Sequence, residues 1–221
     1  MKTYKMNAVI IGALFIFTML AGMVDAFFVA PQFNQPIAHI LQIDNTILVG
    51  VFSVLIMAIG LVLIAITFFP VIKLQSESIA RMYVILRTIE CLLLIVGSLC
   101  YLFIIALGKQ YTTETVSSNY AIAIAIALKI KYYGYLLAMT VLGFGSLFLC
   151  YSLYVSRLVP RFLSLWGAIG YLLLLISAVL NLCGILDITN GMTSILYIPG
   201  GLWEMIAFPL WLFTKGFNLK W

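Results

Sequence analysis

Long apolar runs alternate with short polar breaks along this chain of 221 residues. An α-helix rises about 1.5 Å per residue, so about 20 mostly apolar residues cross a hydrocarbon core about 30 Å thick. Six runs meet that length, at residues 8–30, 46–69, 80–107, 132–155, 162–182 and 192–214. The breaks between them are polar or carry turn-forming residues, as in PQFNQP, SRLVPR and DITNG. The pattern predicts one all-α domain over residues 1–221, a polytopic integral membrane bundle of six transmembrane helices.

The composition indicates a protein that lies in a membrane. Hydrophobic residues make up 65% of the chain, charged residues only 9%, and the mean hydropathy is +1.19. A soluble domain with so few charges would aggregate. No segment has the composition of a soluble domain, a linker or a low-complexity tract.

The net charge of +5 is distributed unevenly between the two ends of the predicted bundle. One end carries Lys2, Lys5, Lys73, Arg81, Arg157, Arg161, Lys215 and Lys220. The other end carries mainly Lys109, with Lys129 and Lys131 beside the fourth span. Cytoplasmic loops are enriched in lysine and arginine, so we expect both termini on the cytoplasmic side. The basic surplus therefore indicates orientation, and no nucleic-acid partner is expected.

The first apolar run is expected to be a retained helix. A secretory signal peptide also begins with a basic stretch such as MKTYK, but its apolar region spans only about 7 to 15 residues. The run over residues 8–30 is longer, and AGMVDA is a poor cleavage site.

Side chains suited to metal binding or nucleophilic catalysis are few. The single histidine, His39, falls in the first outer loop, which excludes an HExxH zinc motif and a Ser–His pair within the spans. The four cysteines are Cys91, Cys100, Cys150 and Cys183. They stand singly, so no disulfide framework, metal site or cofactor is expected. Gly143, Gly145 and Ser146 lack the lysine of a phosphate loop, and we expect these small residues to let two helices approach closely.

Charged residues inside the third span are the main candidates for function. Tyr83, Arg87 and Glu90 are spaced by four and by three, so they share one face of a helix. An ionisable side chain near the bilayer centre costs about 2.5 to 3.5 kcal/mol on insertion scales, so both charges should turn inward and pair. Alternatively, Arg87 and Glu90 form an ion pair that only stabilises the architecture. Arg87 is close enough to the cytoplasmic end to extend its side chain toward it.

Two further acids lie in or near other spans. Asp25 is near the outer end of the first helix, where a shifted boundary would place it among the headgroups. Glu204 follows YIPGG, and Pro199 with Gly200 and Gly201 can interrupt the sixth span. Glu204 would then occupy the first turn of a half-helix, whose positive dipole end favours an acid, as in midplane transporter sites. Alternatively, the last span simply begins at this sequence.

Three segments resemble one family of small bacterial membrane proteins. They are SESIARMYVILRTIECLLLIVGSL, GFGSLFLCYSLYVSRLVPRFLSLWG and PGGLWEMIAFPLWLFTKGF, and they cover the third span and the chain from the fourth span onward. The features that carry the resemblance are the Arg87 and Glu90 spacing, the SRLVPR turn, and the acid Glu204 before WLFTKGF. The chain resembles domain-of-unknown-function family 4386. The resemblance implies six spans in a bacterial cytoplasmic membrane, and it implies no activity and no catalytic residues.

The sequence leaves three functions open. The leading hypothesis is the binding or movement of a small amphipathic or lipid-like ligand at a buried site of Arg87, Glu90, Tyr83 and Glu204, with Asp25 as a further candidate. Arg87 would anchor a polar head, and the carboxylates would set its charge or carry protons. A second hypothesis is an intramembrane enzyme that uses Glu90 or Glu204 as a general acid or base. A third is a structural, immunity or sensor protein without a ligand. Membrane lipids are expected partners in each case.

Overall fold

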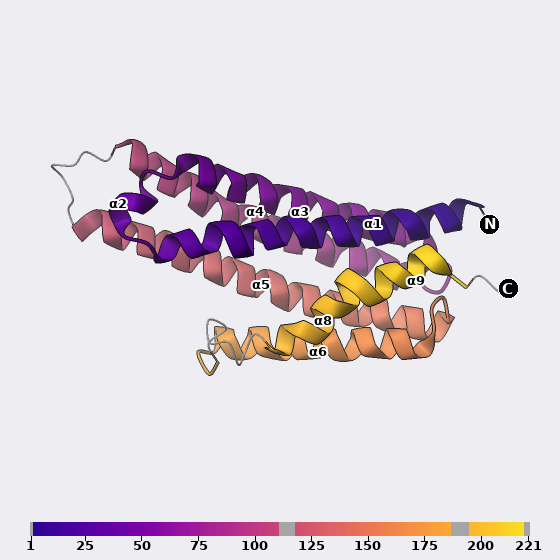
Figure 1. Ribbon diagram of the computed structural model, residues 1–221. Helices are drawn as coiled ribbons and strands as arrows, with labels where there is room; N and C mark the ends of the chain where they lie inside the picture. Colours follow the sequence, from indigo (N-terminus) through magenta and orange to yellow (C-terminus); the bar gives the residue numbers. More distant parts are fainter. Residues whose placement is uncertain (1, 111–117, 187–194, 219–221) are drawn as a thin grey trace.

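Six long helices form one bundle (Figure 1). The computed structural model describes residues 2–110, 118–186 and 195–218. Within those residues, six helices are long and apolar enough to cross a membrane. All regular elements in this part of the chain are helices, so the all-α class is confirmed. The protein is a multi-pass membrane protein.

The first five spans are formed by long helices. The first span consists of α1 Lys2–Val24, extended by the irregular helices η1 Asp25–Val29 and η2 Ala30–Asn34. The short helix α2 Ile37–Ile40 follows it. The next four spans are α3 Asp44–Ile72, α4 Glu77–Lys109, α5 Ser118–Ser156 and α6 Arg161–Leu182. α5 begins at Ser118, whereas the predicted span begins at residue 132. Lys129 and Lys131 lie inside the helix and do not mark its start.

The last span consists of four short helical pieces in one continuous run. They are η3 Ile195–Tyr197, α8 Ile198–Leu202, η4 Trp203–Ala207 and α9 Phe208–Thr214. The expected start of this span at residue 192 lies outside the described residues. Pro199 occupies the first turn of α8, where its missing N–H interrupts no helical hydrogen bond. The described helical run continues from Ile195 through Pro199, so the span is not interrupted at this proline.

The spans are arranged as a ring that the last span closes. Helices that follow one another in the chain pack together, from α1 with α3 through to α5 with α6. The last span runs diagonally across this arrangement, so that α8 packs on α6 whereas α9 packs on α1 (Figure 1). Closure between the first and last spans therefore occurs at the end of the bundle that carries both chain termini.

Apolar side chains cover both the inward and the lipid-facing surfaces of these helices, so the hydrophobic effect does not hold the helices together. Close helix contacts depend instead on small residues, which let two backbones approach. A Cβ atom on Gly170 of α6 would lie 2.8 Å from the Cα atom of Gly200 in α8. Gly143 approaches Leu175 and Gly145 approaches Leu86 in the same way. The expectation that the glycines of the GFGS segment permit close packing is confirmed.

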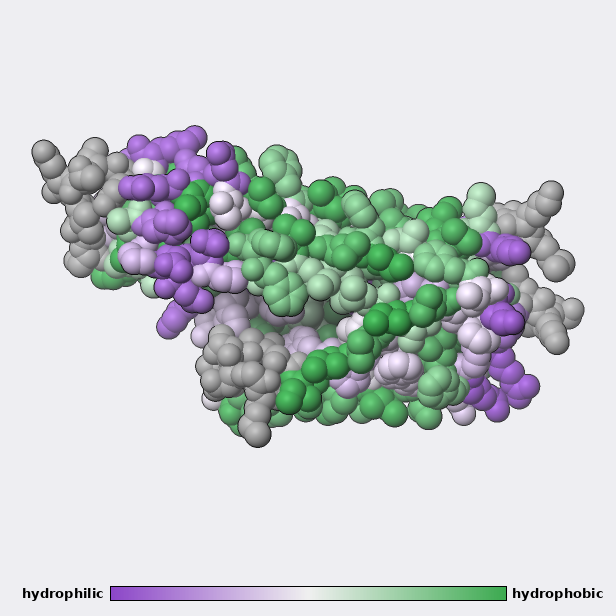
Figure 2. All heavy atoms as spheres, in the orientation of Figure 1, coloured by the Kyte–Doolittle hydropathy of each residue, from purple (hydrophilic) through white to green (hydrophobic). Residues whose placement is uncertain are grey.

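An apolar surface separates two polar ends of the bundle (Figure 2). The ends of α1 and α9 lie together at one of them (Figure 1). The described basic residues at that end are Lys2, Lys5, Lys73, Arg81, Arg157, Arg161 and Lys215. A cytoplasmic location for this end remains a prediction from the charge distribution.

Candidate functional site

Three polar side chains of α4 are buried in the bundle. Tyr83, Arg87 and Glu90 follow one another at helical spacing and face inward together, and the Arg87 side chain is only 2% exposed. The Arg87 Nε donates a hydrogen bond to the Tyr83 hydroxyl at 3.1 Å, and its Nη1 donates to Glu90 Oε2 at 3.0 Å. The arginine and glutamate therefore pair within the helix, as their spacing predicts.

The remaining guanidinium nitrogen of Arg87 reaches two other helices. Its Nη2 donates to the Ser146 hydroxyl of α5 at 3.5 Å and lies 3.7 Å from Glu204 Oε1 in η4. The same Glu204 oxygen accepts a hydrogen bond of 2.5 Å from the Tyr171 hydroxyl of α6. One arginine thus connects α4 to α5 and to the last span, and we call these six residues the arginine site.

The backbone around Glu204 is an irregular helical turn. η4 has the wide hydrogen bonding of a π-helix and ends two residues before Pro209. Proline cannot donate to the carbonyl four residues earlier and clashes with it, and a widened turn relieves that clash. Glu204 therefore projects from a distorted turn in the middle of the span.

The arginine site holds more acid than base. It contains one guanidinium and two carboxyl groups, so its net charge is −1 when both carboxyl groups are ionised. Glu90 Oε2 accepts from Arg87, but Glu90 Oε1 is buried without a hydrogen-bond partner among the described residues. A buried, unpaired carboxylate oxygen is expensive, so this oxygen is suited to bind a proton or a cation.

Asp25 belongs to a different polar cluster, nearer the end of the bundle opposite the chain termini, which is the predicted outer end. It begins η1, a second π-helical turn, which ends two residues before Pro31. Asp25 accepts hydrogen bonds from the Lys131 ammonium at 2.9 Å and from the Tyr101 hydroxyl at 2.8 Å. The Lys131 nitrogen also lies 4.4 Å from the centre of the Tyr101 ring. We call these three residues the outer cluster.

The outer cluster and the arginine site are separate. Tyr101 and Arg87 are both on α4, fourteen residues apart, which is about 21 Å along a helix. The structure therefore brings together Tyr83, Arg87, Glu90 and Glu204, and it does not bring Asp25 to them.

Tyr135 lies on α5 between the two polar regions. It follows Lys131 by four residues and precedes Ser146 by eleven, so all three occupy the same face of the helix. Tyr135 is 37% exposed. An accessible phenol therefore lies along α5 between the outer cluster and the arginine site.

The surface is hollowed next to this region. Figure 2 shows a depression between α1 and α8, and in the same orientation α5 runs behind it (Figure 1). Glu204 keeps 12% of its side chain exposed, in contrast to the fully enclosed Glu90. We call this depression the α1–α8 hollow.

The sequence does not predict four members of these two sites. It indicates only helix packing for Ser146 and a position beside a span for Lys131, and no role for Tyr101 or Tyr171. Lys131 carries a usable signal, because a lysine within a helix long enough to span a membrane should pair with an acid. Ser146, Tyr101 and Tyr171 carry none, since serine and tyrosine are common in transmembrane helices.

Comparison with known proteins gives one match. A family model described as Domain of unknown function (DUF4386) matches residues 10–216. No curated protein and no solved structure matches the chain.

Proposed function

The chain belongs to the DUF4386 family, a family of unknown function, and we propose that it binds a small amphipathic ligand with a cationic head at the arginine site, in exchange for a proton. The observation that carries this proposal is the surplus carboxyl group: Glu90 and Glu204 share the single guanidinium of Arg87.

The charge of the arginine site favours a cation over an anion. Arg87 already contacts two carboxylates, a tyrosine and a serine, so it has little capacity left to anchor an anionic head. A surplus negative charge in the membrane interior is strongly unfavourable unless a proton or a cation neutralises it. A proton and a cationic ligand therefore compete for the same carboxyl groups.

Aromatic rings surround the acids of the arginine site and suit an amphipathic ligand. Trp203 packs edge-on against Tyr171, with ring centres 5.6 Å apart, and stacks on Phe208 at 4.3 Å. Aromatic faces attract cations, and their apolar bodies bury the rest of an amphipathic molecule. This environment is unsuited to a fully hydrated metal ion.

The α1–α8 hollow offers a route to the arginine site. Glu204 is the partly exposed acid of the site, and Tyr135 is exposed on the helix behind the hollow. The exposed ring of Tyr135 is suited to interact with the cationic head of a ligand that enters between α1 and α8.

The proposal is tested with two probe ions of the same shape and opposite charge. Tetraphenylphosphonium and tetraphenylborate are titrated separately against the purified full chain in detergent, and binding is measured by equilibrium dialysis. The cation should bind and the anion should not. The affinity for the cation should rise with pH, because protons compete with it for Glu90 and Glu204.

The variant Glu204→Gln keeps the shape of the side chain and removes its charge. It should weaken binding of tetraphenylphosphonium about tenfold, equivalent to about 1.4 kcal/mol, while thermal unfolding shows a folded protein. The matched control is Glu77→Gln, which changes an exposed acid of α4 paired with Lys73 and Arg81. Equal affinity for the two probe ions, or an equal loss in both variants, would contradict the proposal and favour an architectural role.

A further inference from the structure

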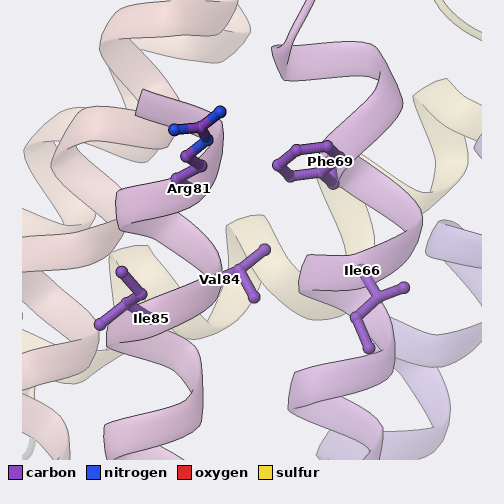
Figure 3. A pocket seen from close by; sticks show the side chains of 5 residues that line it. All are labelled: Ile66, Phe69, Arg81, Val84 and Ile85. Carbon is purple, nitrogen blue, oxygen red and sulfur yellow. The ribbon is translucent and has the colours of Figure 1, made fainter. Parts of the chain in front are cut away.

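A groove on the lipid-facing surface lies between α3 and α4, near the end that carries the chain termini. It encloses about 350 Å³ and is lined by Ile66 and Phe69 of α3 and by Arg81, Val84 and Ile85 of α4. Figure 3 shows Arg81 and Phe69 facing each other across the upper part of the groove, with the aliphatic side chains below them. The groove thus has an apolar length and one charged end.

The charged end of this groove has a positive surplus. Glu77 Oε1 lies 2.5 Å from Arg81 Nη2 and 3.4 Å from the Lys73 ammonium, so two cations share one carboxylate. The Lys73 nitrogen also lies 5.9 Å from the centre of the Phe69 ring, beside the groove. Arg81 uses Nη2 for Glu77, and guanidinium has five N–H donors, so donors remain to bind an anion.

We propose that this groove binds one molecule of an anionic phospholipid, with an acyl chain along Ile66 and Ile85 and the phosphate at Arg81. Charge complementarity supports the proposal, because the net positive charge of Lys73, Glu77 and Arg81 matches an anionic headgroup and not a zwitterionic one. Basic pockets between transmembrane helices bind anionic headgroups in the same manner. The proposal does not depend on the arginine site.

A second groove provides an internal comparison. It lies between α1 and α9, encloses about 600 Å³ and has only apolar lining residues, namely Ile10, Ala13, Leu14, Ile16, Phe17, Leu20 and Phe213. Acyl chains should occupy it without any preference for a headgroup. The charge at Arg81 therefore distinguishes the α3–α4 groove from an ordinary lipid-facing surface.

The experiment measures the lipids retained by the full chain. The purified protein is mixed with equal amounts of phosphatidylglycerol and phosphatidylcholine that carry identical acyl chains, and bound lipid is counted by native mass spectrometry. Phosphatidylglycerol should be retained preferentially. Arg81→Gln should reduce that preference about fivefold, the effect expected for one basic residue at a membrane surface. Arg161→Gln removes a charge from the same end, outside the groove, and should leave the preference unchanged.

Two bulky variants test the position of the lipid. Ile85→Trp should fill the α3–α4 groove and lower the retention of phosphatidylglycerol, whereas Ala13→Trp in the α1–α9 groove should not change the ratio of the two lipids. Absence of any preference in the unaltered chain would overturn the proposal. So would equal losses in Arg81→Gln and Arg161→Gln, which would mean that the whole basic end attracts anionic lipid. Displacement by inorganic phosphate would identify free phosphate as the ligand and also overturn it.

Discussion

At the scale of single residues, the buried Arg87 joins four polar side chains of the interior. Its nitrogens contact Tyr83, Glu90, Ser146 and Glu204, which come from three different spans. Removing one partner of a buried ion pair costs more than removing both, because a lone buried charge remains. The difference in cost is large for Arg87, because its loss leaves two carboxyl groups without a counter-ion.

Arg87→Leu should therefore lower the free energy of unfolding by about 3 to 5 kcal/mol. The double variant with Glu90→Gln should recover part of that loss, because one of the stranded acids is then neutral. Glu90→Gln alone should be tolerated, since Arg87 keeps Glu204 as its counter-ion. Unfolding in mixed micelles, followed by titration with dodecyl sulfate, measures all three. If the single and double variants lose the same stability, Arg87 and Glu90 do not interact energetically.

At the scale of helices, two acids that approach a basic residue of another span lie in widened turns. Asp25 is in η1 and Glu204 is in η4, and each turn ends two residues before a proline. Widened turns are frequent at functional sites because they reorient a side chain without ending the helix. The last span also makes a close contact between backbones, where Gly170 of α6 meets Gly200 of α8.

Gly170→Ala should destabilise the last span. The added methyl group would lie 2.8 Å from both the Cα and the N atoms of Gly200, and backbone atoms cannot move aside as a side chain can. Overpacking of this kind costs about 1 to 3 kcal/mol, which a shift of the thermal unfolding midpoint in detergent would measure.

Gly201→Ala is the matched control for this contact. Its methyl group would have Met19 Cε at 4.0 Å as its nearest neighbour, which is ordinary van der Waals contact. Alanine also favours helix over glycine by about 1 kcal/mol, so this variant should be neutral or more stable. An equal loss in Gly170→Ala and Gly201→Ala would show that the α6–α8 contact is not a tight one.

At the scale of the whole molecule, charge distribution and the ring of helices define two different ends. The end with the chain termini carries seven described basic residues, whereas the other end carries Lys109, Lys129 and the paired Lys131. Translocation across a membrane disfavours basic loops, so the end with the termini should face the cytoplasm.

Labelling of cysteines in intact bacterial cells tests this orientation. The exposed Cys183 at the outer end of α6 is a natural reporter and should react with a membrane-impermeant maleimide added outside. In a Cys183→Ser background, His39→Cys should react in the same way, whereas Lys5→Cys and Lys215→Cys should react only after the cells are opened. Reaction of Lys5→Cys from outside would overturn the orientation with both termini in the cytoplasm.

The sequence by itself determined what depends on composition and on local helical geometry. A run of about 20 apolar residues forms a membrane-spanning helix, because the backbone N–H and C=O groups in hydrocarbon must form their hydrogen bonds within the segment. The pairing of Arg87 with Glu90 followed for the same local reason, since residues three apart share a helix face.

Only the tertiary structure decided which helices meet and therefore which polar groups share a site. In a membrane span the inward and outward faces are both apolar, so periodicity does not identify a packing partner. Ser146 and Glu204 reach Arg87 from other spans, Tyr171 of α6 contacts Glu204, and Asp25 contacts Lys131, which is 106 residues away in the chain. The contact of Glu204 depends on the closure of the helix ring by the last span. The surplus acid at Arg87 exists because that closure brings Glu204 to a pair that was already complete.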